Sequence, residues 1–325
     1  MTTVPRAATL VVAVAAFALF ACSPRERHVP GSGTLTSGNH TLTLRHGGRQ
    51  RSYIVHVPPG TASGPRAVLL AFHGGGGNAA GFQQYAELDR VADRERFVVV
   101  YPNGTGLLPN RLLTWNAGDG CCGYALNNGI NDVGLVSALL MDLESRTPID
   151  RSRVYATGHS NGGIFAHRLA AERSNLIAAV APVAGALDLQ SFAPARPVPV
   201  LQIHSVDDPR ALYNGGLGPP FPGTNNRVQH QPVQAGLERW IVANGCSTRP
   251  DTAEMKIGTG QTAMRLEWRS CREGATVAHW KLSGSGHGWP GLADPPGGEA
   301  ISGPQTTLIT AAAEVWAFVS KFRLP

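Results

Sequence analysis

Ser160 lies at the centre of the segment GHSNG (158–162), which matches the pattern G-x-S-x-G. The stretch 153–157 before it predicts a β-strand, and 162–172 after it predicts a helix. In that context the pattern is typical of a nucleophile elbow, a sharp turn that exposes the serine oxygen at a helix N-terminus, where the helix dipole favours negative charge. Such a serine performs acyl transfer. The simpler alternative is a glycine-rich turn with a helix-capping serine.

A glycine run, HGGGG over 73–77, directly follows the apolar stretch 67–72. Acyl transfer needs N–H donors fixed where a carbonyl oxygen becomes an oxyanion, and glycines let backbone N–H groups approach a ligand closely. We therefore predict that Gly75 or Gly76 supplies one donor and that Asn161, the residue after the serine, supplies the other. The alternative is that the run is only a flexible turn.

A general base and an acid are predicted downstream of the serine. His287 lies in the segment GSGHGW (284–289), and a glycine-rich loop can carry an imidazole back to the serine. Asp207 and Asp208 both follow an apolar stretch, and either can be the acid. The order serine, aspartate, histidine is that of α/β-hydrolases.

Three further histidines, His73, His159 and His204, lie inside these motifs, and we expect them to be structural. Their spacing matches no zinc motif, so neither a metal nor an organic cofactor is predicted.

Alternating strands and helices must position these residues. Short apolar or alternating stretches predict strands over 41–44, 53–57, 67–72, 97–101, 153–157, 177–183, 198–204 and 275–282. Longer patterns predict helices over 81–96, 162–172, 228–244 and 306–322, and one N-capped by Asp132. This alternation predicts an α/β fold: a mostly parallel, doubly wound sheet with an antiparallel N-terminal edge, in a single domain. The long Gly-, Asn- and Pro-rich stretches 103–131 and 209–227 are predicted to be functional loops.

The basic residues indicate a solvated surface. Lys and Arg number 28 against 22 Asp and Glu, a formal charge of +6, but they are scattered singly, which argues against a nucleic-acid partner.

The first residues predict export. Arg6 precedes an apolar run over 10–21, long enough for a signal-peptide core and too short to cross a bilayer. The run ends in LFAC (19–22), which resembles a bacterial lipobox despite its atypical Phe20. We therefore predict a signal peptide over 1–21, a tether over 22–33 with a lipid on Cys22 and a catalytic domain over 34–325. The protein would then lie in the periplasm or cell envelope as a lipoprotein, or be secreted if cleavage leaves no lipid.

Four cysteines remain beyond Cys22, and an even number in an exported chain suggests disulfides. Of the three possible pairings we favour Cys246–Cys271. Adjacent Cys121 and Cys122 would then form a vicinal disulfide or stay as thiols, and their spacing fits no zinc site.

Together these segments resemble the polyhydroxybutyrate depolymerase and feruloyl esterase family, including its LpqC-type lipoproteins. The matching segments are HGGGGN (73–78), WNAGDGCCG (115–123), NDVG (131–134), TGHSNGG (157–163), HSVDDP (204–209), NGC (244–246) and GHGWPG (286–291), in the family's order. The resemblance covers nearly all of the chain after the tether and implies the α/β-hydrolase fold.

The resemblance also implies roles for particular residues. The family places its acid four residues after the histidine of an H-G-x-x-D segment, which is Asp208 here, although Ser205 replaces the usual glycine. It supports the pairing of Cys246 with a later cysteine. It further implies that Trp115 and Trp289 line an acyl or aryl pocket.

The expected function is therefore a serine esterase with the triad Ser160, Asp208 and His287. Its partner would be a small or oligomeric ester, of the feruloyl or 3-hydroxybutyrate type, and membrane contact would come only through a lipid on Cys22. A catalytically silent lipoprotein that binds a small ligand is the alternative from another class, and peptidases and acyltransferases share the fold.

Overall fold

A computed structural model describes residues 34–60, 64–221, 225–292 and 299–325. The predicted signal peptide, the tether and Cys22 lie outside these residues. Among the described helices, none is both long and apolar enough to cross a membrane.

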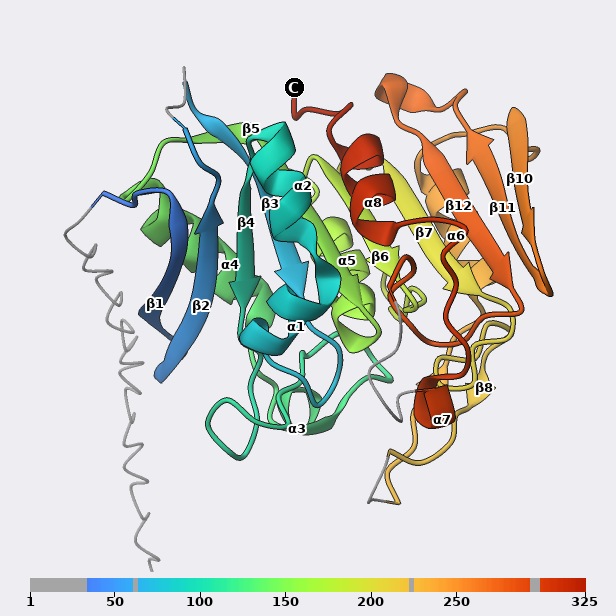
Figure 1. The fold of residues 1–325 in the computed structure, drawn as a ribbon, viewed down its shortest axis with the longest axis horizontal. Coiled ribbons are helices and arrows are strands. Elements are labelled where there is room, and N and C mark those ends of the chain that lie inside the picture. The colour runs from blue at the N-terminus through green and yellow to red at the C-terminus, as the bar shows by residue number, and fades with distance from the viewer. Residues whose placement is uncertain (1–33, 61–63, 222–224, 293–298) are drawn as a thin grey trace, which may run out of the picture.

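The central sheet has ten strands in the order β1-β2-β4-β3-β5-β6-β7-β12-β11-β10 (Figure 1). Their bounds are β1 Gly38–His46, β2 Arg49–Val57, β3 Arg66–Phe72, β4 Val98–Pro102, β5 Ile149–His159, β6 Ala179–Val183, β7 Val200–Ser205, β10 Thr252–Gly258, β11 Gln261–Trp268 and β12 Val277–Ser283. The strands from β4 to β12 in this order run parallel, and two antiparallel strands extend the sheet at each end. The expected α/β-hydrolase fold class is confirmed.

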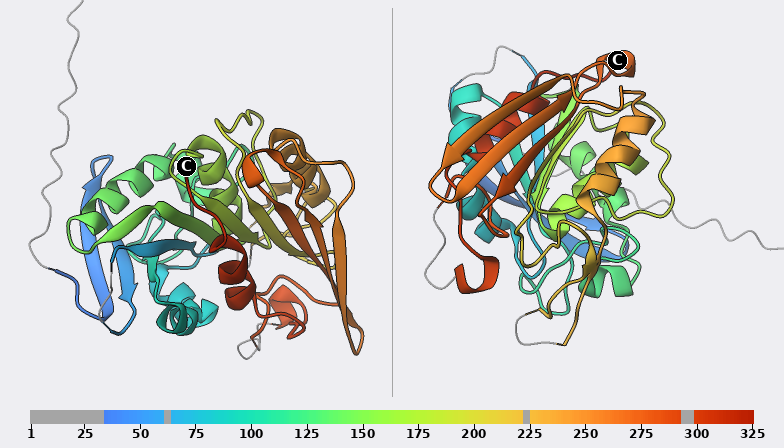
Figure 2. Two further views of the ribbon diagram at one scale, coloured as in Figure 1. Left: turned by 90° about the horizontal axis from the view of Figure 1, so that it is seen from above. Right: turned by 90° about the vertical axis from the view of Figure 1, so that its right-hand side faces the viewer.

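Helices cover both faces of the sheet, as Figure 2 shows. One layer holds α1 (Ala79–Ala86), α2 (Leu88–Glu95) and α8 (Ala311–Val319); the other holds α4 (Asp132–Glu144), α5 (Asn161–Glu172) and α6 (Val233–Ala243). Smaller elements are α3 (Gly123–Asn127), β8 (Gly216–Leu217), β9 (Gln229–His230), a 3-10 turn (Arg272–Gly274) and α7 (Glu299–Ser302).

Strand β3 illustrates why the central strands are continuously apolar. Successive side chains of a strand point to opposite faces. Leu70 and Phe72 therefore join the core under α4, α5 and α6, while Leu69 and Ala71 join the core under α1, α2 and α8. All seven residues of β3 are buried. If every second residue were polar, its side chain would be buried without a hydrogen-bond partner in the core on one face of the sheet.

Several boundaries differ from the sequence expectation. The helix predicted over 81–96 is two helices, because Glu87 between them adopts a left-handed conformation (φ 51°). The N-cap of α4 is Asn131, whose side chain accepts the N–H of Gly134, and not Asp132. The hairpin β10–β11 at the edge of the sheet was not predicted.

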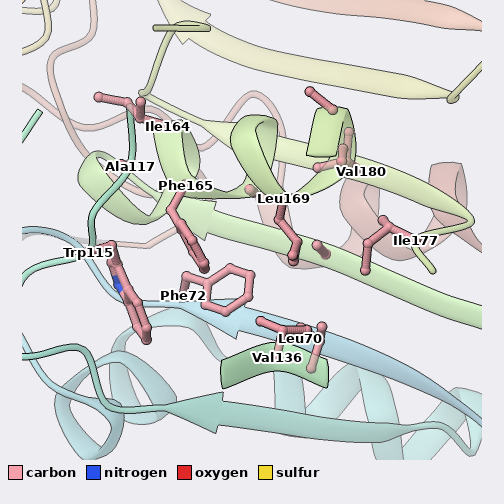
Figure 3. Packing of buried hydrophobic residues seen from close by; sticks show 14 of the residues in the cluster. Leu70, Phe72, Trp115, Ala117, Val136, Ile164, Phe165, Leu169, Ile177 and Val180 are labelled. Atoms are coloured by element: carbon pink, nitrogen blue, oxygen red, sulfur yellow. The ribbon is translucent and has the colours of Figure 1, made fainter. Parts of the chain in front are cut away.

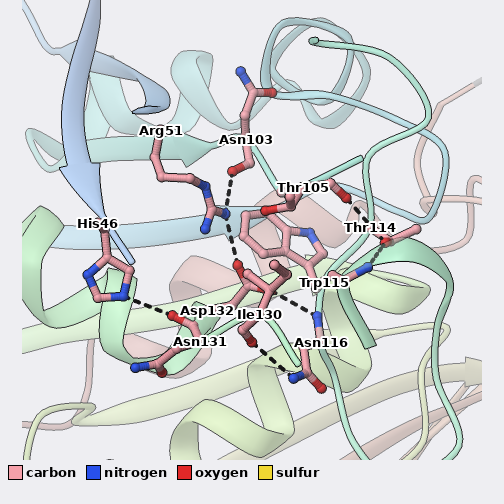
Figure 4. A network of polar contacts seen from close by, with 12 residues as sticks. His46, Arg51, Asn103, Thr105, Thr114, Trp115, Asn116, Ile130, Asn131 and Asp132 are labelled. Atoms are coloured by element: carbon pink, nitrogen blue, oxygen red, sulfur yellow. Dashed lines mark hydrogen bonds and ion pairs between the residues drawn. The ribbon is translucent and has the colours of Figure 1, made fainter. Parts of the chain in front are cut away.

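Asp132 has another role, which Figure 4 shows. Its carboxylate accepts hydrogen bonds from Arg51 at 2.8 Å and from the N–H of Asn116 at 2.9 Å. Arg51 also donates to the carbonyl of Asn103. These contacts fix both ends of the predicted functional loop 103–131 against strand β2.

The described part of the chain contains two disulfides, Cys246–Cys271 and Cys121–Cys122. The second is vicinal, with a cis peptide bond, and lies within the loop 103–131.

Candidate active site

Ser160 is the residue between β5 and α5. Figure 1 shows these two elements side by side in the middle of the sheet. The backbone of Ser160 is held at φ 55° and ψ −121°, a conformation that non-glycine residues rarely adopt and that is typical of strain at functional turns. Both flanking glycines are sterically required. A Cβ at Gly158 would lie 2.4 Å from the carbonyl oxygen of Gly162, and a Cβ at Gly162 would lie 2.2 Å from that of Phe72.

His287 reaches the serine from the loop after β12. Its Nε2 lies 2.9 Å from Ser160 Oγ. The neighbouring His159 donates from Nε2 to the backbone carbonyl of His287 at 2.8 Å, which fixes the loop that carries the imidazole. Burial, followed by the charge of His287, lowers the pKa of His159 to about 3, so His159 stays neutral. Its role is therefore to position His287 and not to carry a proton.

Asp208 lies behind the imidazole. Its Oδ2 is 2.7 Å from His287 Nδ1, while its Oδ1 accepts the N–H groups of Arg210 and Ala211 at 2.8 and 2.7 Å. Burial opposes ionisation, but the charge of His287 and hydrogen bonds from His204 and His287 outweigh it and hold the pKa of Asp208 well below its usual range. The carboxylate is therefore ionised at neutral pH.

The oxyanion-hole donors predicted from the sequence are Asn161 and either Gly75 or Gly76. Gly75 and Asn161 both line the cleft that contains Ser160, and a Cβ on Gly75 would lie 3.5 Å from the Cβ of Asn161. The N–H of Gly76 instead donates to the carbonyl of Leu113 at 2.8 Å. Of the two glycines left open by the sequence, the structure therefore favours Gly75 and argues against Gly76.

The side chain of Asn161 links the elbow to the loop 103–131. Its Oδ1 accepts the N–H of Trp115 at 2.8 Å, and its Nδ2 donates to the carbonyl of Trp115 at 3.1 Å. The same Nδ2 lies 3.5 Å from the sulfurs of both Cys121 and Cys122. The vicinal disulfide thus forms one wall of the cleft beside the predicted oxyanion hole.

The prediction that Trp115 and Trp289 line a substrate pocket is wrong. Trp115 is fully buried and stacks on Phe165 at 5.2 Å between ring centroids (Figure 3). Its indole N–H donates to the carbonyl of His73. Trp289 is buried against Phe82 in the core on the opposite face of the sheet. Both tryptophans pack in the core next to the motif loops, and neither is among the described residues that line the cleft.

Other residues form the cleft wall. Besides Ser160, His287, Gly75 and Asn161, it is lined by Cys121, Cys122, Ile164, Arg210, Ala211, Pro219, Phe221, Val228 and His230. Six of these residues come from 210–221 and 228–230, which overlap the predicted functional loop 209–227. The length and composition of that loop were the only sequence signal for these residues.

The remaining motif histidines have structural partners. His73 accepts the N–H of Gly104 at 3.0 Å, and burial lowers its pKa to about 4. His204 lies 3.3 Å from Asp208 and 2.8 Å from the carbonyl of Ala211. Within the described residues no cluster of potential ligands could hold a metal ion.

Comparison with known proteins identifies a family. Residues 51–235, more than half of the chain, match the family model described as "Esterase PHB depolymerase". Feruloyl esterase D of Neurospora crassa is 26% identical over 305 residues, which cover 90% of this chain and 89% of that protein. A bifunctional acetylxylan esterase/xylanase of Neocallimastix patriciarum is 29% identical over 253 residues. That match covers 77% of this chain but 32% of the longer fungal protein.

Solved structures share the fold. An acetyl xylan esterase from Aspergillus awamori superposes with a TM-score of 0.50 at 15% identity, covering 73% of this chain and 89% of that one. A structure titled "Crystal Structure of sOPH Native" gives a TM-score of 0.55 at 15% identity, covering 90% of each chain.

Proposed function

Because this chain belongs to the Esterase PHB depolymerase family and is a carboxylic ester hydrolase, we propose that it cleaves esters through a covalent acyl-enzyme on Ser160. The observation that carries the proposal is the continuous hydrogen-bonded chain from Ser160 Oγ through His287 to Asp208, with distances of 2.9 and 2.7 Å. Its three members come from three separate loops at one edge of the sheet.

The proposed reaction has two steps. His287 Nε2 takes the proton of Ser160 as Oγ attacks the ester carbonyl, and Asp208 stabilises the resulting imidazolium. The N–H groups of Gly75 and Asn161 hold the oxyanion. His287 then protonates the leaving alcohol, and a water activated by the same imidazole releases the acid and restores the serine hydroxyl.

We propose a small or oligomeric ester of the feruloyl or 3-hydroxybutyrate type as the substrate. The relatives named as feruloyl and acetylxylan esterases, and the family description, support both classes. The apolar side chains of Ile164, Phe221 and Val228 in the cleft suit a short acyl or aryl group. Rates on methyl ferulate and on hydroxybutyrate oligomers, measured side by side, would choose between them.

The test of the mechanism is Ser160→Ala. The variant should lose hydrolysis of p-nitrophenyl acetate and labelling by a fluorophosphonate probe, while its circular dichroism stays native. Ser247→Ala, at an exposed serine, is the matched control and should keep both. A wild-type protein that the probe does not label would favour the silent ligand-binding alternative.

Export also stays a proposal. The apolar run over 10–21 and Cys22 support a signal peptide followed by a lipidated cysteine. Mass spectrometry of the mature N-terminus tests it: an acylated Cys22 supports anchoring in the cell envelope, and an unmodified N-terminus near residue 22 supports secretion.

A further inference from the structure

Arg210 lies in the wall of the cleft that holds Ser160 and His287, and it is the cationic side chain among the described lining residues. It is only partly buried. No carboxylate of the described residues lies within ion-pair distance of its guanidinium. The acyl-transfer steps proposed above do not use this charge.

Three contacts hold Arg210 in place. Its N–H donates to Asp208 Oδ1 at 2.8 Å, so its backbone is tied to the catalytic acid. Its Nη1 donates to the carbonyl of Pro220 at 3.1 Å. Its guanidinium carbon lies 5.8 Å from the ring centroid of Phe221, within reach of a cation–π contact. The remaining guanidinium N–H groups are left to meet solvent or a ligand.

No carboxylate is among the described residues that line the cleft. Asp208 is ionised but lies behind His287, and its oxygens accept hydrogen bonds from His287 and from the amides of Arg210 and Ala211. Burial lowers the pKa of the other lining imidazole, His230, to about 4, so that it is neutral at ordinary pH. The cleft therefore presents one fixed guanidinium beside a mostly apolar wall, and this arrangement favours an anionic ligand group.

We propose that Arg210 binds a carboxylate of the substrate next to the scissile ester, so that the enzyme prefers esters carrying a free acid. The inference rests on the proposed function. A short oligomer of a hydroxy acid fits this description, because its last ester bond joins an acyl group to an alcohol that bears the terminal carboxylate. Guanidinium and carboxylate form paired, charge-assisted hydrogen bonds, which neutral esters cannot make.

The experiment compares matched esters. The linear dimer of 3-hydroxybutyrate and the N-methylamide of its terminal carboxyl share one scissile ester bond but differ in the charge on the alcohol side. Monomethyl succinate and methyl butanoate make the same comparison on the acyl side. For each pair the ratio of kcat/KM, anionic over neutral, is measured at low and at 0.5 M salt for the wild type, Arg210→Gln, Arg210→Lys and Arg249→Gln. Arg249 is an exposed arginine and controls for net charge.

The wild type should favour the anionic member of at least one pair, and Arg210→Gln should lower that ratio by about tenfold or more, mainly through KM. Arg210→Lys should retain part of the preference, Arg249→Gln should retain all of it, and salt should weaken it. The pair that responds tells which side of the ester carries the recognised carboxylate.

A wild type that cleaves the neutral esters with no preference for the anionic ones would overturn the inference while leaving the proposed function intact. So would a ratio that Arg210→Gln leaves unchanged. A wild type that cleaves none of the four esters and resists the fluorophosphonate probe would instead overturn the proposed function.

Discussion

Asp207 and Asp208 are adjacent in the chain, but their carboxylates have different partners. Asp208 Oδ2 lies 2.7 Å from His287 Nδ1, whereas Asp207 Oδ2 accepts the N–H of Gly284 at 2.7 Å. Asp208 is buried and Asp207 is exposed. The geometry thus separates a carboxylate that orients the imidazole from one that ties together the loops after β7 and β12.

We predict that Asp208→Asn lowers kcat on p-nitrophenyl acetate by roughly 10³- to 10⁴-fold, because a neutral amide neither stabilises the imidazolium nor holds the productive tautomer of His287. Asp207→Asn is the matched control and should cost less than tenfold. A larger loss for the Asp207 variant would reverse the assignment of the acid.

The buried pair of Arg51 and Asp132 should matter for stability. Both side chains are nearly inaccessible, so removing Arg51 leaves a buried carboxylate without its charged partner. We expect Arg51→Met to lower the free energy of unfolding by about 3 kcal/mol in urea titrations. The double variant Arg51→Met with Asp132→Asn should recover part of this loss, since the amide still accepts the N–H of Asn116. A double variant less stable than the single one would contradict this account.

Acid should destabilise the fold before most carboxylates titrate. Burial lowers the pKa of four enclosed imidazoles to about 3 or 4; they are His73, His159, His167 and His279. The unfolded chain binds their protons below pH 6.5, whereas the folded chain does not, so stability falls as pH drops through that value. At pH 5.5 each of these histidines should therefore lower the free energy of unfolding by about 1 kcal/mol.

Melting temperatures between pH 7.5 and pH 5.5 check this expectation. The fall should be smaller in His167→Gln, which removes one of the four titrating groups. A melting temperature that stays constant over this range would contradict it.

The disulfide Cys246–Cys271 spans 25 residues and joins the segment after α6 to the one after β11. By the chain-entropy model its loss should cost roughly 3 kcal/mol. We expect the double variant Cys246→Ala with Cys271→Ala to unfold at lower urea concentration and to keep its esterase activity, because neither cysteine lines the cleft. Loss of activity in a variant that remains folded at the assay temperature would contradict this separation.

The sequence predicted those features that short stretches encode. The strand over 153–157, the glycines around Ser160 and the helix after them specify an elbow locally, because a Cβ at either glycine would collide with backbone. The parallel strands were also predictable, since burial on both faces leaves a continuous apolar run, as in β3.

Features that depend on packing over long distances were not predictable. Trp115 belongs to the family-like segment 115–123, but the sequence does not say whether its ring enters the cleft or the core. That depends on its packing against Phe72 and Phe165, which come from other elements. Choosing between Gly75 and Gly76 required knowing that Leu113, far along the chain, accepts one of the two N–H groups. The same holds for Arg210 and Phe221, which reach the cleft only through the path of a long loop.

The amides of Arg210 and Ala211 donate hydrogen bonds to the carboxylate of Asp208. This contact divides the loop into a part that holds the triad and a part that only lines the cleft. The backbone of Arg210 and Ala211 holds Asp208, whereas Pro219, Phe221, Val228 and His230 line the cleft without contacting that carboxylate. A loop transplanted after Ala211 would therefore replace the rest of the cleft wall that this loop supplies while leaving the triad and Arg210 in place.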